Sequence, residues 1–310
     1  MKFQVQRETF LKPIQAVTGV VERRQTMPIL SNLLLSLNDG NLAVTATDLE
    51  VELQSTVALD GGESGDITVP GRKLLDICKA LPDNAQLDIS YDKNRLTVRS
   101  GKSRFTLSTL PAAEFPLVED INTQVRFSAP QNVLKRLLDK TQFAMAQQDV
   151  RYYLNGLLLE LRDKGWRAVA TDGHRMALTD AELDGVEAGM QIIVPRKGVL
   201  ELQRLLSDSD DPVDIEIGSN HIRVRLAGQQ FTSKLIDGRF PEYERVIPAH
   251  SDKLLQPARQ GLREALQRTA ILSNEKYRGV RLALSNGTLK LQAHNPEQEE
   301  AEEEIALEYQ

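Results

Sequence analysis

The sequence predicts an α+β protein built from copies of one unit, in which antiparallel strands alternate with amphipathic helices. The first observation is an internal repeat, because Asp48, Asp172 and Asn295 hold the matching place in successive copies, 124 and 123 residues apart. The copies span residues 29–53, 152–178 and 277–307. The second observation is a series of short β-rich runs joined at Asp39-Gly40, Ser100-Gly101 and Asn286-Gly287. Such pairs are typical of hairpin turns between antiparallel strands.

Each repeat is expected to run strand, helix, three strands, and then the same order once more. Residues 68–81 match 193–206, and both predict a strand that ends at proline, Pro70 or Pro195, before a helix. Phe105 and Phe231 begin matching segments that predict a strand and then a loop closed by Phe-Pro. Helices are predicted at Arg7–Thr18, Arg72–Leu81, Gln131–Phe143, Arg196–Leu206 and Arg259–Ala270.

The repeat period divides the chain into domains at 1–122, 123–248 and 249–310. The last of these corresponds to half a repeat, because its second helix would begin at about residue 318, whereas the sequence ends at Gln310. Half a repeat is expected to leave an apolar face and a sheet edge uncovered.

Composition indicates an ordinary globular protein, with 41% hydrophobic and 26% charged residues. No run approaches the roughly 18 apolar residues of a membrane span, and the N-terminus is too polar for a signal peptide. A cytoplasmic protein with no membrane partner is therefore expected. The single cysteine, Cys78, lies among apolar residues and is predicted to be a buried core residue.

The charge is segregated along the chain. The five predicted helices carry 14 bases and 5 acids, whereas the whole chain has a net charge of −6. Basic helices without aromatic residues to stack on bases favour contact with a phosphate backbone over base readout. The alternative is that these bases are only solvent-exposed charges on the helix surfaces, without a binding role.

Several long strings resemble one family over the whole chain. They are DVRYYLNGLLLE, VATDGHRMAL, IVPRKGV, FTSKLIDGRFPEY and ILSNEKYRGVRL. Together they resemble the bacterial sliding clamps, the beta subunits of DNA polymerase III. The resemblance implies tandem repeats of the DNA-clamp fold, two complete and one half, with helices lining a basic inner face and antiparallel sheets outside. It also implies a processivity factor without catalytic activity or cofactor, which encircles double-stranded DNA of any sequence as a head-to-tail homodimeric ring.

The resemblance assigns three groups of residues. Positions implied to face DNA are Arg24, Arg72, Lys73, Lys79, Gln148, Tyr152, Arg196 and Lys197. The implied pocket for short hydrophobic motifs of DNA polymerase and clamp-loader subunits comprises Leu154, Thr171, Gly173, His174, Arg175, Met176, Pro241, Arg245 and Val246. The implied dimer interface comprises Arg95, Arg99, Lys102, Arg104, Ile271, Leu272, Glu297, Glu299, Glu300 and Glu303. Because the third repeat is a half, poor ring closure is expected.

The sequence leaves two other functions open. Asp172 and His174 lie two apart in a strand-like segment, as an acid–base or metal-binding pair of a metal-dependent enzyme would. The matching residues, Asp48 with Glu50 and Asn295 with Glu297, do not preserve that pair, which makes catalysis the least favoured function. The other alternative is a scaffold that binds replication partners without encircling DNA.

Overall fold

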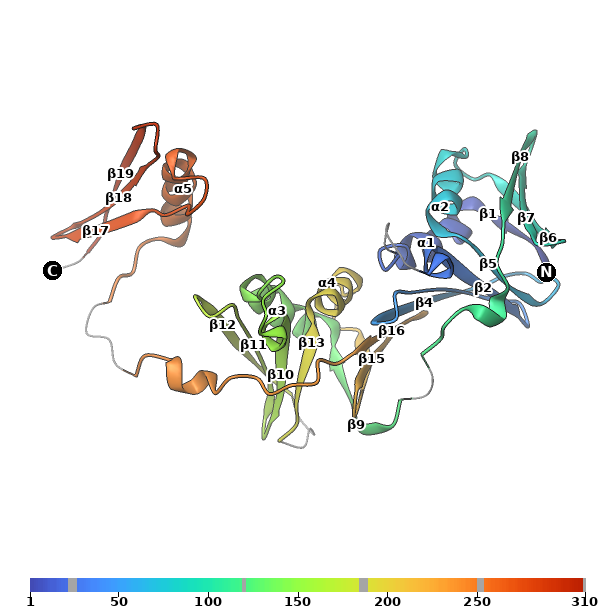
Figure 1. The fold of residues 1–310 in the computed structure, drawn as a ribbon, viewed down its shortest axis with the longest axis horizontal. Coiled ribbons are helices and arrows are strands. Elements are labelled where there is room, and N and C mark those ends of the chain that lie inside the picture. Colours follow the sequence, from blue (N-terminus) through green and yellow to red (C-terminus); the bar gives the residue numbers. More distant parts are fainter. Residues whose placement is uncertain (22–26, 119–120, 184–188, 250–253, 309–310) are drawn as a thin grey trace. The chain divides into compact units, whose positions relative to one another are not determined.

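The computed structural model describes residues 1–21, 27–118, 121–183, 189–249 and 254–308. The chain forms two compact units, Met1–Pro241 and Glu242–Gln310 (Figure 1). Within the described ranges, no helix is long and apolar enough to cross a membrane.

The first unit contains the predicted order of elements twice. The first copy is β1 (Lys2–Gln6), α1 (Arg7–Val17), β2 (Asn32–Asn38), β3 (Asn41–Thr47), β4 (Val51–Ala58), β5 (Gly65–Pro70), α2 (Gly71–Ala80), β6 (Gln86–Asp92), β7 (Arg95–Ser100) and β8 (Ser103–Ser108). The second copy is β9 (Thr123–Pro130), α3 (Gln131–Thr141), β10 (Gly156–Arg162), β11 (Gly165–Thr171), β12 (Met176–Glu182), β13 (Gln191–Pro195), α4 (Arg196–Leu205), β14 (Pro212–Gly218), β15 (His221–Leu226) and β16 (Gln229–Lys234). The predicted repeat is therefore confirmed.

Local sequence explains where these elements begin and turn. Strands β5, β9 and β13 each end at a proline, and a helix begins at the next residue. Asp39 and Gly40, with φ of 48° and 75°, form the tight turn between β2 and β3 that their sequence predicts. Short 3₁₀ helices lie in the connections, at Pro28–Ser31, Ala112–Glu114, Gln142–Ala144, Tyr152–Leu154, Tyr243–Val246 and Ala270–Leu272.

One sheet crosses the boundary between the two repeats. It has eight strands in the order β5-β2-β3-β4-β16-β15-β14-β9, so that β4 of the first repeat pairs antiparallel with β16 of the second. Leu53 lies opposite Phe231 in this pairing, and both side chains are fully buried in the shared core. Two four-stranded sheets, β1-β6-β7-β8 and β12-β11-β10-β13, complete the unit.

The helices pack on the sheets in pairs. Helix α1 contacts β3, β4 and α2, while α3 contacts β11, β12 and α4 (Figure 1). Their apolar residues, such as Ile14 and Leu134, are fully buried, and so is Cys78 on α2. Burial raises the pKa of the Cys78 thiol to about 12, which confirms the predicted core role.

A buried polar contact fixes the connection that follows the first repeat. The Glu52 carboxylate accepts a hydrogen bond from the backbone N–H of Val118 at 2.8 Å. Burial raises the pKa of Glu52, and Arg223 of β15 lies near enough to oppose this shift. The connection is thereby held against the sheet that joins the repeats.

The second unit contains α5 (Arg259–Thr269), β17 (Arg281–Ser285), β18 (Thr288–His294) and β19 (Glu300–Ala306). Its three strands form one antiparallel sheet whose core is Ala265, Leu289 and Leu291. The strand predicted before α5 is not formed by residues 254–258, so that prediction was wrong. In the first unit the opening strands β1 and β9 pair with β6 and β14, and the described part of the second unit has no counterpart of those partners.

Candidate DNA and partner-binding surfaces

The basic residues of α2 and α4 have repeated structural roles. Arg72 donates to the Val21 carbonyl at 2.8 Å, and Arg196 donates to the Met145 carbonyl at 3.4 Å. Both pairs are one repeat apart, 124 residues in each case. Each guanidinium is thus fixed to the chain that follows the preceding helix, α1 or α3.

Lys197 joins the two repeats. Its ammonium group forms an ion pair with Asp48 of the first repeat and donates to the Val20 carbonyl at 3.2 Å. Because the Asp48 side chain is only 5% exposed, this pair lies mostly out of solvent. The charge of Lys197 is therefore partly neutralised by the protein itself.

Half of the helical bases stay without a protein partner. Arg7, Lys135, Lys197, Arg204 and Arg268 are in ion pairs. Among the residues that the structure describes, seven helical bases have no ion pair or side-chain hydrogen bond: Lys12, Lys73, Lys79, Arg136, Lys140, Arg259 and Arg263. Arg24 lies outside the described residues.

Gln148 and Tyr152 belong to one exposed loop. Gln148 has a φ of 54°, an unusual backbone conformation for a non-glycine residue. Tyr152 is 56% exposed, and its ring packs edge-on against Tyr153 at a centroid distance of 5.8 Å.

Between Gln148 and Tyr152, the loop is fixed by Asp149. The Asp149 carboxylate accepts hydrogen bonds from the Arg151 guanidinium at 2.9 and 2.8 Å and from its backbone N–H at 2.8 Å. These bonds lower the pKa of Asp149 to about 2. A carboxyl group with a depressed pKa stays ionised until the pH falls to that value, so the pair persists at every pH near neutrality.

The turn between β11 and β12 carries most of the predicted pocket residues. Asp172 accepts hydrogen bonds from the backbone N–H groups of His174 and Arg175 at 2.9 and 3.0 Å. Thr171 donates its hydroxyl proton to the Arg175 carbonyl at 2.7 Å, and Gly173 adopts a φ of 87°. The sequence predicted these residues but not this closed network.

The same turn explains why Asp48, Asp172 and Asn295 match. Asp48 accepts the N–H groups of Glu50 and Val51, and Asn295 accepts that of Glu299. The role of Asp172 is therefore that of a turn residue, and its carboxylate is already occupied. No group of three or more His, Cys, Asp or Glu side chains suited to a metal ion occurs in the part of the chain that the structure describes.

Arg175 extends the turn toward α3. Its guanidinium bonds to Asp172 at 3.1 Å and to the Phe143 carbonyl at 2.8 Å, and it lies over the Phe143 ring at 5.7 Å. Phe143 is 51% exposed and supplies an apolar surface that the sequence reasoning missed. In the sequence, Phe143 is marked only as an apolar residue at the end of a predicted helix, and that feature is too common to identify a binding residue.

The structure brings together only part of the predicted pocket. Leu154 is buried and Met176 is half-buried beside the turn, in the same unit as Thr171 to Arg175, and Pro241 ends that unit. Arg245 and Val246 belong to the second unit, where Arg245 pairs with Glu242 and Val246 is 69% exposed.

The predicted dimer residues are divided between the two units, and some of them lie on strands. Arg95 and Arg99 lie on β7, Lys102 follows in the turn and Arg104 lies on β8. In the second unit, Ile271 is 76% exposed, Leu272 ends the same 3₁₀ helix, Glu297 and Glu299 precede β19, and Glu300 and Glu303 lie within it. Glu303 bonds to Arg268 of α5, with an Nε–Oε2 distance of 3.0 Å.

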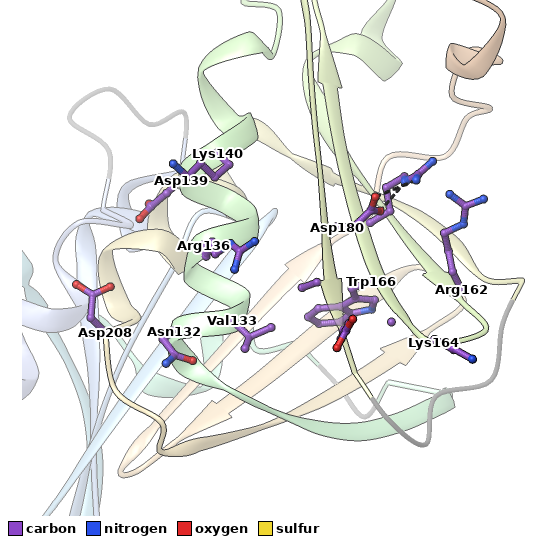
Figure 2. A pocket seen from close by; sticks show the side chains of 14 residues that line it. Asn132, Val133, Arg136, Asp139, Lys140, Arg162, Lys164, Trp166, Asp180 and Asp208 are labelled. Atoms are coloured by element: carbon purple, nitrogen blue, oxygen red, sulfur yellow. Dashed lines mark hydrogen bonds and ion pairs between the residues drawn. The ribbon is translucent and has the colours of Figure 1, made fainter. Parts of the chain in front are cut away.

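A cavity of about 1000 Å³ lies elsewhere, between α3 and the ends of β11 and β12. Figure 2 shows Arg136 and Asp139 of α3 on one side, and Trp166 and Arg162 on the other. It contains none of the predicted site residues. Its α3 residues are the counterparts of α1 residues such as Lys12, which line a groove beside Arg204 of the next repeat. The cavity therefore lies on the face of α3 that corresponds to the face of α1 beside the second repeat.

Family models match the chain three times in succession. The DNA polymerase III beta subunit N-terminal domain matches residues 1–119, its central domain matches 128–242, and its C-terminal domain matches 244–310.

Individual relatives agree with this assignment. The beta sliding clamp of Pseudomonas aeruginosa is 59% identical and that of Escherichia coli K12 is 52% identical, each over 100% of this chain and 85% of the relative. A solved structure of the Pseudomonas aeruginosa sliding clamp bound to griselimycin has a TM-score of 0.95 at 58% identity, with 100% of this chain and 85% of that one covered. For the Caulobacter crescentus pol III beta structure the TM-score is 0.92 at 39% identity, with the same coverage. This chain belongs to the DNA polymerase III beta subunit family, the beta sliding clamps.

Proposed function

We propose that the chain is a DNA polymerase processivity factor, which encircles duplex DNA as a sliding clamp and tethers polymerase and clamp-loader subunits through its central repeat. The observation that carries this proposal is the match to beta sliding clamps over the whole chain, at 52–59% identity among the relatives named above. The proposed role is one of binding, without catalysis, in the cytoplasm. The three family-model matches support repeat domains at 1–122, 123–248 and 249–310.

The pairing of β4 with β16 offers a template for ring closure. Strand β4 of the first repeat pairs with β16 of the second, and their counterparts in the other repeats are β12 and β19 for β4 and β8 for β16. In the first unit β8 is an edge strand, and in the second unit β19 is an edge strand. We propose that β8 of one copy pairs with β19 of another, which makes the contact head-to-tail.

The register of β4 with β16 identifies the residues that would lie opposite each other if β8 of one copy paired with β19 of another. Gln54 lies opposite Gln230, and their counterparts in the repeats are Glu302 on β19 and Arg104 on β8. Opposite charges at this position favour pairing of β8 with β19 and oppose pairing of β8 with itself. The remaining predicted interface residues of both strands flank this pair.

Charge reversal tests the proposed dimer contact. Arg104→Glu is expected to weaken self-association about tenfold, because it places two carboxylates opposite each other. Adding Glu302→Arg restores the opposite charges and is expected to recover most of the loss. Sedimentation velocity over a concentration series measures the dissociation constant. If the double variant loses as much dimer affinity as the two single variants together, the proposed register is wrong.

For the DNA-facing surface we propose phosphate contacts by helical bases. Lys73 and Lys79 are free of protein partners within the described residues, whereas Arg72, Arg196 and Lys197 have structural bonds as well. Gln148 and Tyr152 add exposed polar contacts from the loop after α3. Contacts with phosphates do not depend on the base sequence, so they allow a protein to slide along DNA.

A comparison of closed circular DNA with the same DNA after one cut tests whether the protein encircles the duplex. Once loaded, the protein is expected to stay on a closed circular duplex and to be lost when that duplex is cut once, because a ring leaves only over an end. Gel filtration of the protein–DNA complex before and after cutting measures retention. Equal retention on both forms would favour the scaffold or a static backbone contact instead.

A further inference from the structure

The bonded pair of Asp149 and Arg151, here called the clip, does more than close its own loop. One guanidinium nitrogen of Arg151, Nη2, also donates to the Asp172 carbonyl at 3.3 Å. A Cβ atom at Gly173 would lie only 3.0 and 3.1 Å from the two terminal nitrogens of that guanidinium. The clip therefore rests directly on the turn that carries the predicted pocket residues.

The other side of the clip is equally well held. The backbone N–H of Asp149 donates to the Asn155 side chain at 2.9 Å, and the Asn155 amide donates back to the Asp149 carbonyl at 2.9 Å. These bonds hold the residue that directly follows Gln148, whose positive φ needs support from its surroundings. Asn155 thus holds the loop at Asp149, Asp149 holds Arg151, and Arg151 contacts the turn.

Only the central repeat has this pair. The positions that match Asp149 and Arg151 are Gln25 and Met27 in the first repeat. In the third repeat the helix lies 128 residues and the hairpin 123 residues after its counterpart, so the segment between them is five residues shorter, and residues 270–280 contain no Asp-x-Arg sequence. The turn around Asp48 is instead tied to Lys197 of the neighbouring repeat. The clip therefore occurs where both an exposed loop after the helix and the proposed partner pocket occur together.

We propose that the clip is a positioning device shared by two binding surfaces, in which Arg151 and Asp149 hold the DNA-facing loop and the partner-binding turn as one preorganised block. The inference rests on the proposed function of these two surfaces. Its physical basis is that fixing a loop in its binding conformation removes part of the entropic cost of association. Loss of the clip therefore weakens the binding of duplex DNA and of a partner peptide together.

Asp149→Asn distinguishes the clip from simple electrostatics. Removing a negative charge beside DNA should tighten DNA binding if only net charge matters. The clip predicts the opposite: roughly fivefold to tenfold weaker binding of both a fluorescein-labelled duplex oligonucleotide and a labelled peptide with Leu and Phe anchors. Arg151→Gln should reduce peptide binding by the same factor, and the double variant should be no worse than either single change.

Arg167→Gln is the matched control. Arg167 forms a similar two-bond pair with Asp180, at 2.6 and 2.9 Å, at the far end of the same strands β11 and β12. It is expected to leave peptide binding unchanged. Circular dichroism melting of each variant should stay close to wild type, because exposed ion pairs contribute little to stability.

Fluorescence anisotropy titrations at fixed low salt measure both affinities. Tighter DNA binding by Asp149→Asn, or peptide binding at the wild-type level in either clip variant, overturns the clip while leaving the proposed function intact. A wild-type protein that binds neither probe overturns the proposed function and the clip with it.

Discussion

Phe231→Ala is expected to lower the free energy of unfolding of the first unit by about 3–5 kcal/mol. Phe231 is fully buried on β16, opposite Leu53 of β4, where the sheet passes from one repeat to the next. Its removal leaves a cavity in the core that both repeats share. Chemical denaturation followed by circular dichroism measures the change.

Phe105→Ala is the control for this change. Phe105 holds the matching place on β8, but there it is half-buried on an edge strand that pairs with no other repeat in the described part of its own chain. Its loss is expected to cost about 1–2 kcal/mol, since less apolar surface is removed from water. Equal effects at the two positions would show that the joined sheet adds no stability to the first unit.

Arg175→Glu is expected to reduce the affinity for a Leu/Phe-containing partner peptide by more than about 100-fold. The change removes the contacts with Asp172 and Phe143 and sets a second carboxylate beside Asp172. The turn that carries the proposed pocket residues is then expected to lose its shape as well as its positive charge. Isothermal titration calorimetry with the peptide measures the effect.

Arg167→Glu tests whether that loss is local. It breaks a comparable pair with Asp180 in the same two strands, at the end away from the turn. Peptide affinity is expected to remain within about twofold of wild type. A loss as large as that of Arg175→Glu would place the pocket elsewhere or point to damage to the whole sheet.

The local elements were predictable because their signals are local. The prolines before α2, α3 and α4 and the pair Asp39-Gly40 between two strands act within a few residues of where they occur, and the repeat period carries these signals from one copy to the next. The pairing of β4 with β16 was not predictable in this way, because two edge strands far apart in sequence carry no local mark of each other. The strand expected before α5 failed for the same reason, since a strand needs a partner as well as a suitable sequence.

For the candidate sites too, the identity of the residues was predictable from the sequence, whereas their contacts in the folded chain were not. The resemblance supplied residues such as Arg175 and Lys197, and the helical charge could be counted directly from the sequence. The bonds of those residues could not be predicted, because they depend on which side chains meet in the folded chain. Lys197 with Asp48 and Arg151 with Asp149 are both charge pairs, yet one joins two repeats and the other closes a single loop.

The ion pair of Lys197 with Asp48 affects how steeply the affinity for DNA falls with salt concentration, because a paired base displaces fewer of the cations condensed on DNA. Each base that replaces a condensed cation on DNA makes affinity fall more steeply with salt, at about 0.9 logarithmic units per contact. If all 14 helical bases of one chain did so, the slope would be about −13, whereas the nine bases of the described helices outside ion pairs would give about −8. Bases whose charge an ion pair already neutralises in part, such as Lys197, release fewer cations, so DNA affinity depends less steeply on salt than the count of lysines and arginines implies.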